Sequence, residues 1–219
     1  MNRSQMRKEI RALADDITPN PYLWSEDFLN MRIDEARKQA SRRAKLFVTS
    51  EEQVCRMLVK ANVPFSTLDP RIINIRQIYK SDTDVPICKV HHEDLNDRFP
   101  GWRTQTGETL GYCMGVEKRK IRWLMTPSAD ITIRLLAVVE ADCWDNDNDE
   151  DAYFAERYQY ELMSWVLYRM YSKRDSDQYA PDLAKDYYDQ FEAEFGPPSR
   201  AVEEQWVLEN QGFTDDGAR

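Results

Sequence analysis

Two short groups of side chains in this sequence have types and spacings that could bind a metal ion. The first is the adjacent pair His91 and His92, followed by Glu93 and Asp94. Neighbouring residues of a strand point to opposite faces, so these two histidines cannot easily share one ion. The sequence also lacks HExxH, whose spacing of four puts two histidines on one helical face. We interpret the pair as the solvated end of a strand.

The second group is Asp145, Asp147 and Asp149 at alternate positions, with Glu156 eleven residues after Asp145. This spacing imitates a calcium loop, in which oxygen ligands at positions 1, 3, 5 and 12 surround one ion. The sixth position of such a loop is a glycine that makes a sharp turn, and here it is Glu150. Carboxylates favour helix N-termini, so we interpret the segment as an acidic, solvated approach to a helix. A metal-dependent hydrolase that uses these residues is the weaker alternative.

Other catalytic motifs are missing from the sequence. It contains no GxSxG motif, no glycine-rich phosphate loop and no CxxC pair. The four cysteines lie in or beside apolar runs, where reduced cysteine behaves as a small hydrophobic side chain; they are Cys55, Cys88, Cys113 and Cys143. We expect free thiols, no catalytic residue and no cofactor.

Charge is distributed unevenly along the chain. The net charge is −9, with +3 over residues 1–50, +1 over residues 51–141 and −13 over residues 142–219. A protein that binds DNA tightly neutralises phosphates with Lys and Arg, so the last third would repel DNA. One basic cluster stands out, made of Lys118, Arg119, Lys120 and Arg122. We interpret it as an exposed hairpin tip, with a nucleic-acid patch as the alternative.

Composition predicts a folded protein without a membrane segment. Hydrophobic residues make up 42% of the 219, which is enough to form a core. No run approaches the ~18 consecutive apolar residues of a membrane-spanning helix. The charged start, Met1 to Ile10, is unlike a signal peptide.

The positions of apolar residues predict helices near both ends of the chain. A first helix is expected over Ser4–Ile17, and a second begins after Ser25, a residue type that caps helix N-termini. A third helix is expected from Ala152 and a fourth over 181–195. The third has an apolar stripe broad enough to contact more than one neighbour, which includes Tyr158, Leu162, Trp165, Val166 and Met170.

Between the helices, short β-branched and aromatic runs separated by turn residues predict strands. The expected strands are Val54–Val59, Ile72–Tyr79, Pro86–Val90, Leu110–Gly115, Ile121–Thr126 and Ile131–Glu140. A hairpin turn is expected at Glu117–Arg119, and a short helical turn at Glu93–Phe99.

These elements predict an α+β fold. A helical bundle body, residues 1–50 and 142–196, would carry a β-rich insertion over residues 51–141, a small antiparallel sheet or sandwich between the second and third long helices. Residues 197–219 would form an extended acidic C-terminal arm. Its apolar side chains are unusual for a free tail, so docking on a partner competes with plain disorder.

Four short motifs follow one another in a definite order. They are Trp24-Ser25-Glu26-Asp27-Phe28-Leu29 before Asp34-Glu35-Ala36, Phe99-Pro100-Gly101-Trp102, Pro127-Ser128-Ala129-Asp130, and the set Ala184, Tyr188 and Phe191. Their order over residues 5–196 resembles the head-to-tail adaptor proteins of tailed phages. The insertion departs from that family's pattern, because residues 107–112 lack the usual proline.

The resemblance implies a structural virion protein at the head–tail interface, made in the host cytoplasm. Such proteins form a ring, commonly of twelve copies, between the portal protein and a tail nozzle, tube or stopper protein, and genomic DNA passes through the channel. The C-terminal arm would dock on the portal, which makes its apolar residues the candidate partner-binding set: Trp206, Val207, Leu208 and Phe213. The broad stripe of the third helix is the candidate contact between subunits. Another head-completion or host-interaction protein remains the alternative.

Overall fold

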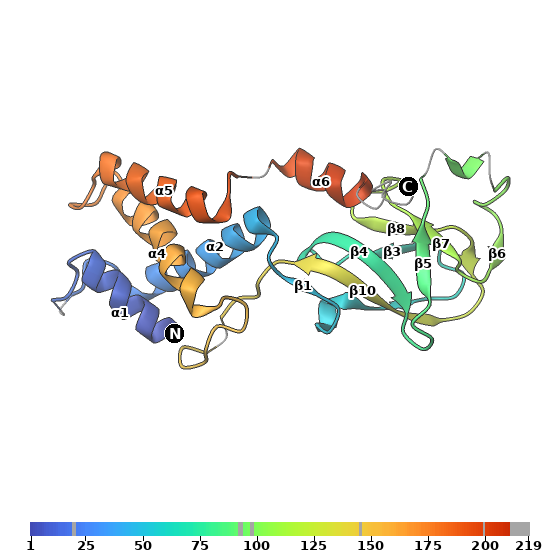
Figure 1. The fold of residues 1–219 in the computed structure, drawn as a ribbon, viewed down its shortest axis with the longest axis horizontal. Coiled ribbons are helices and arrows are strands. Elements are labelled where there is room, and N and C mark those ends of the chain that lie inside the picture. Colours follow the sequence, from blue (N-terminus) through green and yellow to red (C-terminus); the bar gives the residue numbers. More distant parts are fainter. Residues whose placement is uncertain (19–20, 92–93, 97–98, 145, 199, 211–219) are drawn as a thin grey trace, which may run out of the picture. The chain divides into compact units, whose positions relative to one another are not determined.

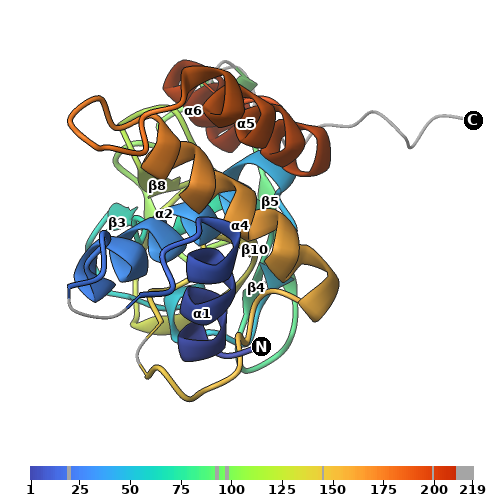
Figure 2. The same cartoon turned by 90° about the vertical axis from the view of Figure 1, so that its left-hand side faces the viewer.

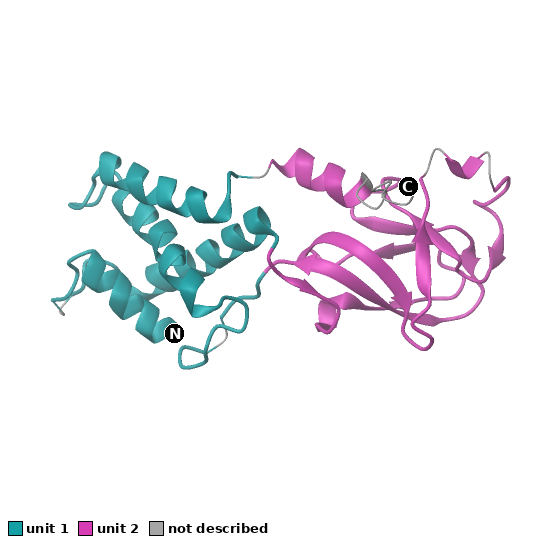
Figure 3. Cartoon of the chain, in the orientation of Figure 1, with its two compact units in different colours: residues 1–45, 141–198 teal, residues 46–140, 199–219 magenta. Residues whose placement is uncertain are grey.

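The computed structural model describes residues 1–18, 21–91, 94–96, 99–144, 146–198 and 200–210. The chain divides into two compact units, which Figure 3 draws in different colours. Met1–Lys45 and Ala141–Pro198 form the helical unit, and Leu46–Glu140 and Ser199–Arg219 form the β unit. The chain is thus a mixed α+β protein. No helix among the described residues has both the length and the apolar character to cross a membrane.

The helical unit is built around one central helix (Figure 1 and Figure 2). Its described helices are α1 (Arg3–Leu13), α2 (Glu26–Ala44), α4 (Glu156–Tyr171) and α5 (Pro181–Phe195). α4 packs against all three others, with its largest contacts to α5 and α2. Most residues from Leu162 to Met170 are therefore buried. The broad stripe predicted for this helix is covered from several sides within one chain.

Helix ends follow local signals. Ser25 caps α2 by accepting a hydrogen bond from the N–H of Phe28 at 3.2 Å, as predicted. α1 ends at Leu13 rather than at Ile17, because Asp15 adopts a left-handed conformation, with φ of 54°, that breaks the helix. α4 begins later than predicted, because the residues immediately before it form a turn. In this turn the carboxylate of Asp151 accepts hydrogen bonds from the N–H groups of Tyr153 and Phe154.

The β unit contains a curled, mostly antiparallel sheet. Its strands run in the order β1 (Val48–Thr49), β10 (Ile131–Val139), β4 (Ile72–Lys80), β5 (Pro86–Lys89), β7 (Gly111–Cys113), β8 (Lys120–Trp123) and β3 (Phe65–Thr67). β2 (Arg56–Val59) follows a 3-10 turn at Gln53–Cys55 and also pairs with β10. Within this sheet β5 and β7 are parallel. A separate parallel pair joins β6 (Thr106–Gly107) to β9 (Thr126–Pro127).

Alternate residues of β10 face the core of the curled sheet. Ile133, Leu135, Ala137 and Val139 are fully buried, because alternate residues of a strand lie on the same face. Every predicted strand overlaps an observed one, and the predicted turn at Glu117–Arg119 joins the antiparallel strands β7 and β8. The described residues 94–96 are helical, within the short turn that was predicted.

The C-terminal segment is helical where an extended arm was predicted. α6 (Ala201–Asn210) belongs to the β unit and contacts β4. Leu208 is 4% exposed and lies in the same buried cluster as Ile72 and Trp123. The prediction of an extended arm is therefore wrong for residues 201–210. Burying this leucine against the sheet removes apolar surface from water and fixes the helix there.

Candidate functional site

Two arginines of α1 bind the acidic segment that precedes α4. Asp147 accepts hydrogen bonds from Nε of Arg3 and from Nη2 of Arg7, each at 2.6 Å. Hydrogen bonds from Arg7, which has the larger effect, and from Arg3 lower the pKa of Asp147 to about 2. The main chain adds a third link, since the N–H of Ser4 donates to the carbonyl oxygen of Asp147 at 3.2 Å. Asp147 is thus paired with two arginines while its side chain stays 36% exposed, and residues 148–150, which follow it, are exposed.

A second ion pair in the same segment is buried. Arg37 of α2 donates to the two carboxylate oxygens of Asp151 at 2.9 and 3.1 Å, and to the carbonyl oxygen of Asp142 at 2.7 Å. The Arg37 guanidinium also lies 4.8 Å from the ring centroid of Trp144. The side chains of Arg37 and Asp151 are 3% and 0% exposed. This pair holds the acidic segment against α2, because a buried charge is stable only with its partner.

This geometry gives the metal-site hypothesis no support. Asp147 directs both carboxylate oxygens to arginines, and Glu156 is exposed in the first turn of α4. Asp149 is exposed as well, and its backbone oxygen accepts a hydrogen bond from the Trp144 indole. Asp145 lies outside the described residues, as do His92 and Glu93. Within the described ranges, no group of three or more His, Cys, Asp or Glu side chains could hold a metal ion.

The candidate subunit-contact stripe of α4 is largely used inside its own chain. Leu162, Val166 and Met170 are fully buried, and Trp165 is 6% exposed. Trp165 packs on Phe191 of α5, with ring centroids 4.9 Å apart. Arg43 of α2 lies 5.1 Å from the Trp165 ring and donates to the Gly196 carbonyl oxygen. Among the five candidates, Tyr158 is the one with appreciable exposed surface, so contact with a neighbouring subunit remains a prediction centred on it.

The candidate partner-binding residues of the C-terminal segment separate onto two faces of α6. Leu208 points into the β unit, whereas Trp206 is 62% exposed and Val207 is half-buried. Val202, one helical turn before Trp206, is 79% exposed. These two side chains form an outward apolar face on an otherwise acidic helix. Phe213 lies outside the described residues.

The basic cluster of the β unit is engaged by its own chain. Arg119 donates to the carbonyl oxygens of Asp69 and Ile72 at 2.7 and 3.0 Å, and Lys120 pairs with Glu117 at 2.6 Å. Arg122 is 4% exposed and donates to backbone carbonyls, including that of Trp123 at 2.6 Å. Burial lowers the pKa of Arg122. Of the four cations, Lys118 is exposed, whereas Arg119 and Lys120 are half-buried and Arg122 is buried.

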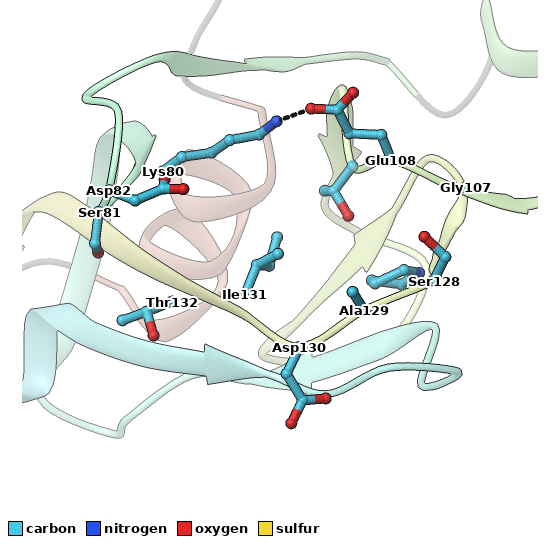
Figure 4. A pocket seen from close by; sticks show the side chains of 12 residues that line it. Lys80, Ser81, Asp82, Gly107, Glu108, Ser128, Ala129, Asp130, Ile131 and Thr132 are labelled. Atoms are coloured by element: carbon cyan, nitrogen blue, oxygen red, sulfur yellow. Dashed lines mark hydrogen bonds and ion pairs between the residues drawn. The ribbon is translucent and has the colours of Figure 1, made fainter.

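A recess in the β unit was not anticipated from the sequence (Figure 4). It encloses about 510 Å³ beside the ends of β4 and β10 and the short strands β6 and β9. Lys80 and Glu108 form an ion pair across it, and Ile131 points into it. Asp130 turns away and accepts a hydrogen bond from the N–H of Ala61 at 2.7 Å. No histidine or cysteine lines the recess, and its lysine is neutralised, so it offers no activated nucleophile.

Comparison with models of known protein families finds a match that spans both units. Residues 1–209, which include helices and strands of both units and nearly all of α6, match the family of SU10 adaptor proteins. No protein with a curated function matches the sequence.

Proposed function

The chain belongs to the SU10 adaptor protein family, and from this membership we propose that it is a structural, non-enzymatic virion protein that joins the head of a tailed phage to its tail. Copies of the chain would form a ring, of twelve subunits in our proposal. The portal protein would bind one side of the ring and a tail protein the other. Genomic DNA would pass through the central channel.

The family match is the observation that carries this proposal. It extends over residues 1–209 and so includes the helical unit, the curled sheet and the C-terminal helix. The motifs that resemble head-to-tail adaptors lie within the same residues. The chemistry agrees, because Asp147, the central member of the residues that imitate a calcium loop, directs its carboxylate to Arg3 and Arg7. The recess beside β4 and β10 likewise lacks an activated nucleophile.

Charge supports a channel through which DNA slides. Each chain carries a net charge of −9, so a ring of twelve would carry twelve times that value. Duplex DNA carries about one negative charge per 1.7 Å of its axis. A negative wall repels DNA and leaves it free to move, whereas a gripping surface would need exposed Lys and Arg. Arg119 and Arg122, which could have bound DNA phosphates, instead donate hydrogen bonds to backbone carbonyl oxygens.

The outward face of α6 is the portal-binding surface in this proposal. Trp206 and Val202 are among the most exposed large apolar side chains of the described residues. Aromatic anchors of this kind supply most of the energy of protein interfaces. Tyr158 on α4 is proposed to contact the neighbouring subunit, with the buried remainder of its stripe acting as support.

The proposal is tested by mixing the purified protein with portal rings and measuring complex formation by native mass spectrometry. We expect a complex with wild-type protein and at least about tenfold weaker binding by Trp206→Asp, the effect of losing an aromatic anchor. Leu110→Asp is the matched control, since Leu110 is 57% exposed in the same unit. It should bind like wild type.

Purified virions give the second measurement. Quantitative mass spectrometry should find the protein in a fixed ratio to the portal protein, at about one copy per portal subunit if both rings have twelve. Absence from virions, together with failure to bind portal rings, would refute the proposed function.

A further inference from the structure

Exposed apolar side chains of the helical unit gather at one end of it. Eight large apolar side chains of its described residues are exposed, and six of them lie near the end of α1 or the start of α5. These six, which we call the apolar end, are Leu13, Ile17, Tyr22, Leu23, Tyr179 and Leu183. Single exposed apolar residues are ordinary on a protein surface, whereas a concentration of them marks an interaction site.

Hydrogen bonds hold the two segments of the apolar end together. The indole Nε1 of Trp24 donates to Oε1 of Gln178 at 3.0 Å, and Nε2 of Gln178 donates to the carbonyl oxygen of Ala14 at 2.9 Å. Figure 1 shows the turn after α1 and the turn between α4 and α5 at the same end of the helical unit. Residues that are distant in the sequence thus form one surface.

A buried ion pair fixes the shape of this surface. Asp16 is 6% exposed and accepts hydrogen bonds from Arg11, at 2.5 Å, and from the N–H of Leu23, at 2.8 Å. Arg11 donates in turn to the carbonyl oxygen of Trp24 at 2.9 Å, and its guanidinium lies 3.8 Å from the Tyr22 ring centroid. These contacts hold Asp16, Leu23 and Trp24 in place, while the side chain of Leu23 faces solvent. Such preorganisation lowers the entropy cost of binding a partner.

The charges around the apolar end restrict what can cover it. Four exposed carboxylates and two exposed cations belong to these segments: Asp15, Asp175, Asp177 and Asp182, with Lys173 and Arg174. The ammonium group of Lys173 lies 5.3 Å from the centroid of the Trp24 ring of its own unit, so it contributes less positive charge to the rim of the apolar end. The carboxylates outnumber the cations, so two copies that met through this same surface would on balance repel each other, which disfavours a symmetric dimer.

We propose that the apolar end of the helical unit docks on a different virion protein, at a surface with an apolar centre and a rim of Lys and Arg. This inference rests on the proposed function and adds to it a second protein-binding surface, separate from α6. Ile17 and Leu23 supply the apolar contact. The net negative charge around the apolar end attracts the basic partner and repels a second copy of the same surface.

Photo-crosslinking in assembled particles tests the inference. Benzoylphenylalanine is placed at Leu23 or Leu183 of the full chain, virions are irradiated, and crosslinked peptides are identified by mass spectrometry. Tyr160, 55% exposed on α4, is the control position. We expect both test positions to crosslink to a different virion protein, within a stretch that contains apolar residues flanked by Lys or Arg. The yield should be several times that of the control.

Each other outcome overturns the inference. Crosslinks to a second copy of this chain would show a subunit contact, and yields no higher than at Tyr160 would show an uncovered surface. The same particles distinguish failure of this inference from failure of the proposed function. If the protein is absent from the particles, both the proposed function and this inference are wrong.

A pair of variants adds a functional measurement. Ile17→Asp combined with Leu23→Asp should lower incorporation into particles at least about tenfold, as expected for losing two central apolar contacts. Met31→Asp, at a position 52% exposed and outside the apolar end, should leave incorporation unchanged. Circular dichroism verifies that both proteins are folded. Normal incorporation of the double variant would contradict the inference.

Discussion

At the residue scale, the acidic segment before α4 shows what sequence patterns can and cannot reveal. The sequence identifies its carboxylates but not their partners, because Asp147 is 144 residues from Arg3 and 140 from Arg7. Here the spacing that imitates a calcium loop has a structural cause and does not reflect calcium binding. The segment must be fastened to α1 and α2, and arginine–carboxylate pairs fasten it. Glu150 in place of the loop glycine argues against a calcium site, but no local signal identifies the arginines as the partners.

The low pKa of Asp147 predicts how stability should depend on pH. Its pKa of about 2 in the folded protein lies below the ordinary value, so the carboxylate stabilises the fold above about pH 4. That contribution is lost as the pH falls through about 2. Asp147→Asn should lower the free energy of unfolding by about 1 kcal/mol at pH 7, less than the shift implies because solvent screens a side chain 36% exposed.

Urea unfolding at pH 7 and near pH 2 measures this effect. The difference between Asp147→Asn and wild type should shrink toward zero at the lower pH. Asp149→Asn is the matched control, because Asp149 is exposed and no arginine pairs with it among the described contacts. An equal deficit at both pH values would mean that the ion pairs with Arg3 and Arg7 are not its source.

Burial makes the pair of Arg37 and Asp151 more important than any surface pair. Arg37→Met removes a cation that is 3% exposed and leaves the fully buried Asp151 carboxylate without it. We expect the free energy of unfolding to fall by about 3–5 kcal/mol, the usual consequence of breaking a buried pair. Lys185→Ala removes an exposed pair with Asp189 and should leave stability unchanged within error. Chemical denaturation compares the two, and similar losses would contradict this ranking.

At the scale of elements, periodicity predicted most of the fold. Alternation along β10 and the cap at Ser25 were both readable, because burial on one face and capping leave local signals. The short strands β1, β3 and β6 were missed, since two or three residues are too few to show a period. α6 was missed for another reason. Its helix buries Leu208 alone, leaves Val207 half-buried and exposes Val202 and Trp206, so it lacks an amphipathic stripe.

Shortening a side chain to alanine should affect stability differently on the two faces of α6. Leu208→Ala removes a side chain that is 4% exposed in the core of the β unit, and should cost about 2–4 kcal/mol of stability. Trp206→Ala removes one that is 62% exposed, and should change stability by less than about 0.5 kcal/mol. Thermal and urea unfolding provide the comparison. A large loss from Trp206→Ala would show that the tryptophan contributes strongly to the stability of its own chain, which would contradict its role as an anchor for the portal.

At the scale of the whole molecule, the distribution of charge connects the structure to the proposed function. The chain is most acidic over residues 142–219, yet Asp147 and Asp151 from this stretch are neutralised by arginines of the helical unit. The carboxylates that remain exposed lie mainly on α5, its preceding turn and α6. A surface of this kind keeps subunits apart until apolar contacts with other proteins overcome the repulsion.

The same charge distribution predicts that the free protein does not bind duplex DNA. The net charge is −9, and Arg119, Lys120 and Arg122 are directed to carbonyls or to Glu117. Fluorescence anisotropy at about 50 mM salt, where electrostatic binding is strong, should detect no complex. Glu117→Lys is the positive control, because it adds one cation and releases Lys120 at the hairpin tip, and should produce weak, salt-sensitive binding. If the wild-type protein bound DNA tightly and Lys118→Ala abolished this binding, the hairpin would be a DNA contact. A channel in which DNA slides freely would then be excluded.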